Sequence, residues 1–71
     1  MSATEAKFNE AMYECLRDAY IAFDNDGEKI AAFEDATDAI IDIFRKRYLE
    51  TNNDMYIDRC CEILAEIVDS M

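Results

Sequence analysis

The sequence predicts an all-α protein, a small antiparallel three-helix bundle that forms a single domain over residues 1–71. Three observations carry this prediction. The chain contains one glycine, Gly27, and no proline, so it has few of the residues that interrupt helices. Apolar residues recur every three or four positions in three segments, which is typical of helices that bury one face. Two short connections rich in turn-forming residues separate the segments, and short connections favour antiparallel neighbours.

The first helix is expected over residues 3–23. Ser2 followed three residues later by Glu5 fits a capping box, which marks the start of a helix. The apolar positions that follow keep helical spacing; they are Phe8, Met12, Cys15, Leu16, Ala19, Tyr20 and Phe23. This segment therefore has one face suited to a core.

The second helix is expected over residues 28–50, after a turn over residues 24–27. The four residues of this turn are all turn formers, Gly27 tolerates a positive φ angle, and Asp26 is placed to cap the helix. One face of the helix is apolar and contains Ile30, Phe33, Ala36, Thr37, Ile40, Ile41, Phe44 and Tyr48. That face spans nearly half of the helix circumference, so it predicts extensive burial.

The third helix is expected over residues 54–70, after the turn formers at positions 51–53. Its apolar face contains Ile57, Cys60, Cys61, Leu64, Ile67, Val68 and Met71. The broad apolar faces suit two arrangements equally well. One is a monomeric bundle, and the other is a helical hairpin that completes its core by forming a homodimer, as chains of this size often do.

The charge of the chain restricts its partners. Seventeen acidic residues oppose seven basic ones, which gives a net charge of −10. Phosphates would repel such a surface, so we expect no direct binding to nucleic acid and none to anionic membranes. A basic protein surface is the natural complement, and a nucleic-acid-binding protein is the kind of partner that carries one.

The compartment predicted from the sequence is the cytoplasm. We expect neither a membrane span nor a signal peptide, because the apolar runs are short and the N-terminal region lacks a basic segment followed by an apolar one. The three cysteines are an odd number and two of them are adjacent. That pattern makes a poor disulfide framework and indicates a reducing compartment, with the cysteines serving as small core residues.

Rows of acidic residues are the candidate partner-binding site. The third helix carries Asp54, Asp58, Glu62, Glu66 and Asp69, and the second carries Glu34, Asp38 and Asp42. Carboxylates four residues apart lie about 6 Å apart along a helix, and each such pair of like charges costs a few tenths of a kcal/mol. One interpretation is that a basic groove recognises these rows; the other is that they only keep the protein soluble.

Several enzyme chemistries lack the residues that they need. The chain has no histidine, so Ser-His and Cys-His pairs and the Glu-x-x-His motif of di-iron bundles are ruled out. The cysteines lack the paired spacing of a zinc site, and no glycine-rich loop is present to hold a phosphate. We therefore expect a non-enzymatic protein with no cofactor and no metal.

In size and charge, the chain resembles small phage-encoded inhibitors, including anti-CRISPR and anti-restriction proteins. This resemblance implies a viral inhibitor that occupies the basic nucleic-acid-binding groove of a partner protein, with the acidic rows as the contact surface. It carries no residue motif. The alternative function from a different class is a homodimeric assembly or scaffolding module.

A second alternative concerns the stretch FDNDGEKIAAFED at residues 23–35, which resembles the calcium-binding loop of the EF-hand family. With Gly27 at the glycine position of that loop, Ala22 and Phe33 replace two of the main ligands. With Asp24 at the first position, Lys29 replaces the glycine. The stretch therefore predicts a degenerate calcium module at most, and a helix–helix turn as the simpler structure.

Overall fold

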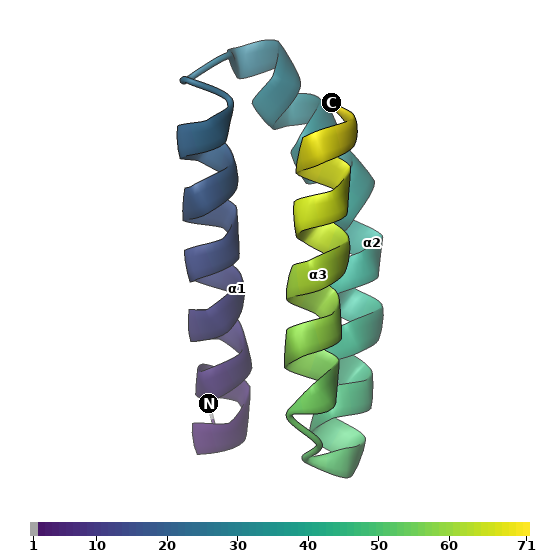
Figure 1. Ribbon diagram of the computed structural model, residues 1–71. Coiled ribbons are helices and arrows are strands. Elements are labelled where there is room, and N and C mark those ends of the chain that lie inside the picture. The colour runs from purple at the N-terminus through teal and green to yellow at the C-terminus, as the bar shows by residue number, and fades with distance from the viewer. Residues whose placement is uncertain (1) are drawn as a thin grey trace.

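The computed structural model describes residues 2–71 and contains three helices, α1 (Ala3–Ala22), α2 (Gly27–Thr51) and α3 (Met55–Ser70). In Figure 1, α1 and α3 run upward and α2 runs downward, so consecutive helices are antiparallel. Each helix packs against the other two. The predicted all-α three-helix bundle is therefore confirmed, and each predicted helix end lies within one residue of the observed end.

The core lies along the line where the three helices meet. Phe8 of α1, Phe33 of α2 and Leu64 of α3 are almost completely buried. The Phe8 ring stacks on Tyr48 with 5.7 Å between the ring centroids. Burial of large apolar side chains from every helix is the main favourable contribution to the stability of a fold this small.

A second aromatic pair closes the end of the bundle near the first turn. The ring of Phe23, which follows α1, packs edge-on against Phe33 at 5.5 Å between centroids. Edge-on aromatic pairs contribute about 0.5–1.5 kcal/mol beyond the burial of their area. Phe23 and Phe33 therefore fix how the chain passes from α1 into α2.

Side-chain caps define two of the helix starts. The Ser2 hydroxyl accepts a hydrogen bond from the Glu5 amide at 3.1 Å, at the start of α1. A carboxylate oxygen of Asp26 accepts hydrogen bonds from the amides of Glu28 and Lys29 at 3.1 and 3.3 Å, at the start of α2. Both predicted capping residues are confirmed, and each satisfies amides that the helix itself leaves unpaired.

Gly27 does not adopt the positive φ angle that a glycine tolerates. The left-handed positions of the turn are Asp24, with φ 52°, and Asn25, with φ 61°, while Gly27 is the first residue of α2. Asp and Asn enter the left-handed region more readily than other residues that carry a side chain. Two such residues already reverse the chain, so the turn does not need the glycine.

Most large apolar residues lie on the inward faces of the helices, and the exposed ones include Tyr13, Ile21, Ile43, Leu49, Met55 and Met71. Among residues 2–71, no helix combines the length and the apolar content that crossing a membrane requires. The one buried polar side chain of the core, Thr37, donates its hydroxyl proton to the Phe33 carbonyl at 2.8 Å. That bond keeps the hydroxyl satisfied inside an apolar environment.

A candidate protein-binding surface

The five acidic side chains predicted as a row on the third helix are all exposed in the structure. Asp54 precedes α3, and the remaining members follow along its outer face: Asp58, Glu62, Glu66 and Asp69. The opposite face of α3 buries Ile57, Cys60 and Leu64. We call these five acidic residues the α3 row.

Two members of the α3 row are neutralised within the chain. Lys7 of α1 lies 3.0 Å from a carboxylate oxygen of Asp54, and Tyr48 donates a hydrogen bond to the same carboxylate at 3.4 Å. Arg59 binds Glu62 at 3.0 Å. The hydrogen bond and the charge of Asp54 raise the pKa of Lys7, which is the expected effect of an opposite charge.

The other three members keep their charge exposed. Within residues 2–71, Asp58, Glu66 and Asp69 form no ion pair and no side-chain hydrogen bond. Two of them lie in the C-terminal half of α3. The unpaired negative charge of the row is therefore concentrated toward the C-terminal end of the helix.

The acidic residues predicted on the second helix, which we call the α2 row, are also exposed but mostly bonded within the chain. Arg45 and Lys46 lie 3.3 and 3.6 Å from carboxylate oxygens of Asp42. Glu34 accepts a hydrogen bond from the Tyr20 hydroxyl of α1, and this bond raises the pKa of Tyr20. Only Asp38 forms no ion pair and no side-chain hydrogen bond among the described residues.

Two grooves flank α1. Glu34 and Asp38 line a groove between α1 and α2, together with Tyr20. On the other side of α1, Asp18 lines a groove between α1 and α3, together with Cys61. Each of the two grooves therefore has acidic side chains in its lining.

Three contacts between helices were not predicted from the sequence. They are the Lys7 pair with Asp54, the Tyr20 hydrogen bond to Glu34, and the contacts of Arg45 with α1. The Arg45 guanidinium donates to Asn9 at 3.3 Å and lies 5.7 Å from the centre of the Phe8 ring. Helical periodicity places each residue on a face of its own helix but gives no signal for which side chains meet across helices.

Asp18 is a further acidic residue that the prediction did not include in the site. It lies on α1 and is exposed, on the side that faces α3. Its carboxylate lies 4.0 Å from the Arg17 guanidinium, so its charge is partly offset within the chain.

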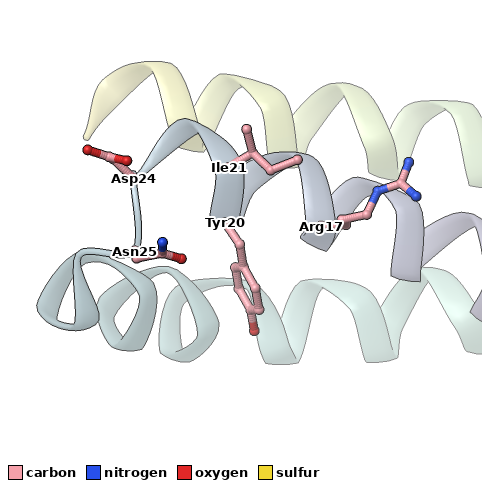
Figure 2. Close-up of a pocket in the computed structure, with 5 residues that line it drawn as sticks. All are labelled: Arg17, Tyr20, Ile21, Asp24 and Asn25. Carbon is pink, nitrogen blue, oxygen red and sulfur yellow. The ribbon is translucent and has the colours of Figure 1, made fainter.

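The turn after α1 forms a shallow hollow of about 260 Å³ (Figure 2). Tyr20 points toward α2, Ile21 points away from it, and Arg17 extends along the helix (Figure 2). The side chain of Ile21 is 72% exposed. Because these side chains diverge, the hollow presents no set of polar groups aimed at one ligand.

The stretch that resembles a calcium loop serves as a helix–helix turn. The Asp26 carboxylate is occupied as the cap of α2, and Glu28 and Glu34 lie exposed on that helix. In the part of the chain that the structure describes, no three His, Cys, Asp or Glu side chains are grouped so that they could hold a metal ion.

Comparisons of the chain with models of protein families, with curated proteins and with solved structures found no match. The role of the α3 row is therefore inferred from its own charge, exposure and pairing.

Proposed function

We propose that the protein is a non-enzymatic acidic binding protein whose α3 row occupies the basic nucleic-acid-binding groove of a partner protein. The observation that supports this function best is the set of exposed carboxylates without partners, at Asp58, Glu66 and Asp69. By size and charge, the function is that of a phage-type inhibitor of the anti-CRISPR or anti-restriction class.

The geometry of a helix suits the imitation of a nucleic-acid strand. Carboxylates one helical turn apart are separated by about 6 Å along the axis. Phosphates on one strand of a duplex advance by about 3.4 Å per nucleotide, which is a spacing of the same order. Arginines that bind phosphates also bind carboxylates, often through two parallel hydrogen bonds. A groove lined with such arginines would therefore accept the α3 row.

The α3 row also costs stability, which argues for a use beyond solubility. Like charges four residues apart on a helix destabilise it by about 0.2–0.5 kcal/mol per pair. Lys7 and Arg59 relieve this repulsion at Asp54 and Glu62. The chain places no cation beside Glu66 and Asp69 in an ion pair, among the residues that the structure describes. A basic partner would supply the missing positive charge.

Affinity capture from the host lysate tests this function, with partners identified by mass spectrometry. The test bait carries three neutralising substitutions in the α3 row: Asp58→Asn, Glu66→Gln and Asp69→Asn. A matched control bait loses the same charge at exposed positions outside both rows: Glu10→Gln, Asp24→Asn and Glu50→Gln. Asn tolerates the left-handed conformation of position 24.

We expect the unsubstituted and control baits to capture a nucleic-acid-binding protein at low salt and to lose it as the salt concentration rises, because contacts between exposed charges are screened. The test bait should lose the partner even at low salt. Equal capture by the test and control baits would show that net charge, and not the α3 row, determines binding. Circular dichroism of all three baits would exclude unfolding as the cause.

A further inference from the structure

All three cysteines of the chain gather where α1 meets α3. Cys15 comes from α1, Cys60 and Cys61 come from α3, and each has a free thiol. Cys15 and Cys61 are partly exposed, whereas Cys60 is completely buried. The prediction that the cysteines are small core residues is confirmed for Cys60, while Cys15 and Cys61 are partly buried and pack against the core.

Cys15 and Cys61 face each other across the groove between the two helices. Cys15 is close enough to Cys61 to raise the pKa of the Cys61 thiol. Both line a cavity of about 240 Å³, together with Asp18, Leu64, Ala65 and Val68. A small reagent that enters this cavity therefore reaches both sulfur atoms.

Cys60 is directed elsewhere, although it is adjacent to Cys61 in the sequence. Consecutive residues of a helix point about 100° apart. The Cys60 sulfur lies in the core, 3.5 Å from the sulfur of Met12. The geometry thus leaves one pair of thiols in position to react together.

We propose that Cys15 and Cys61 form a dithiol site that small disulfides, such as glutathione disulfide, oxidise to a disulfide bond joining α1 to α3. This site is separate from the proposed binding function, because no member of the α3 row takes part in the bond. It would tie the first helix to the last and so close most of the chain into one loop.

The reaction is a pair of thiol–disulfide exchanges. One cysteine thiolate attacks a sulfur of glutathione disulfide, which forms a mixed disulfide and releases one glutathione thiolate. The thiolate of the other cysteine then attacks the protein sulfur of the mixed disulfide, which forms the Cys15–Cys61 bond and releases the second glutathione. Two electrons pass from the cysteines to glutathione disulfide, and the two protons end on the released thiols.

The surroundings of the thiols make this exchange slow at neutral pH. Burial and the neighbouring Cys15 thiol raise the pKa of Cys61 to about 12, and the nearby Cys60 thiol and Asp58 carboxylate act in the same direction. Burial, together with the nearby Cys15 thiol, raises the pKa of Cys60 to about 11, against a smaller opposing effect of Arg45 on α2. Asp18 is the other acidic group at the cavity. Because the thiolate is the attacking species, oxidation should accelerate as the pH rises.

The test uses the full chain, reduced and then freed of reductant, with glutathione disulfide at pH 7 and pH 9. Intact-mass measurement follows after alkylation of the remaining thiols. We expect a monomer that lacks two hydrogens, retains no glutathione and carries one alkyl group. Tandem mass spectrometry of the linked peptides should place the bond between Cys15 and Cys61, with Cys60 alkylated.

Two variants sharpen the result. Cys61→Ser should stop at a stable glutathione adduct, because no second thiol resolves the mixed disulfide. Cys60→Ala should still form the bond. The proposal is overturned if the unsubstituted chain accumulates glutathione adducts, if Cys60 enters the bond, or if the product is a disulfide-linked dimer. The identity of the two linked cysteines in the unsubstituted chain tests the proposal even if a variant folds poorly.

Discussion

Replacement of Asp38 by lysine should stabilise the protein, because the α2 row places like charges on both sides of this residue. Glu34 lies one turn before it and Asp42 one turn after it. Asp38→Lys would remove two repulsions and create two attractions, each of about 0.2–0.5 kcal/mol. The four contributions add up to about 2 kcal/mol at most. The true gain should be smaller, because Glu34 is already bonded to Tyr20 and Asp42 to two cations. We therefore expect a gain of about 1 kcal/mol, or a melting temperature higher by about 4–8 °C.

Urea unfolding followed by circular dichroism measures this gain. Asp38→Gln is the matched control, because Gln and Lys have similar helix propensities and Gln carries no charge. The control should gain about half as much as the lysine variant. In 1 M salt, where the screening length falls to about 3 Å, the difference between the two variants should nearly vanish. If both variants are no more stable than the parent at low salt, the acidic rows have no folding cost and the argument from cost fails.

Three further predictions concern the fold. Leu64→Ala should lower the free energy of unfolding, measured in urea, by about 2–5 kcal/mol, because truncation of this buried side chain leaves a cavity. A loss below about 1 kcal/mol would contradict the place of Leu64 in the core. Asp26→Ala should cost about 1 kcal/mol and Asp26→Asn much less, because asparagine still caps α2; equal losses would argue against the cap. Stability should fall as the pH rises above about 8.5, because the Cys60 and Cys61 thiols ionise in the unfolded chain before they ionise in the folded one. The raised pKa of Lys7 acts in the same direction, since its ion pair is lost only as Lys7 deprotonates. Cys61→Ala should weaken this fall in stability with pH. If stability falls as steeply in the variant as in the parent, the Cys61 thiol is not its cause.

The helices could be predicted from the sequence because local signals agree with the tertiary structure. Ser2 and Asp26 cap helices by bonding amides only two or three residues away, and such short-range bonds can be read from the order of residues. Phe8, Phe33 and Leu64 lie at helical spacing and are buried as expected. The first turn shows the limit, since Asp24, Asn25 and Gly27 all suit left-handed positions and the sequence does not say which of them adopt one.

The candidate site could be predicted only in part. The exposure of the acidic rows followed from helical periodicity, since both rows lie away from the apolar faces. Their pairing did not follow, because Lys7 is 47 residues away from Asp54 in the sequence. Which acidic residues line the grooves beside α1 depends on how the three helices pack. The same limit explains why the Cys15 and Cys61 pair was not predicted.

Competition for the captured partner tests the central claim most directly. The partner is loaded with fluorescently labelled nucleic acid, and the chain is titrated against it while fluorescence anisotropy is followed. We expect full displacement of the nucleic acid by the unsubstituted chain and by the control variant, with a midpoint that rises steeply with salt, and no displacement by the variant neutralised at Asp58, Glu66 and Asp69. A stable complex of partner, nucleic acid and chain together would contradict the claim that the α3 row occupies the groove.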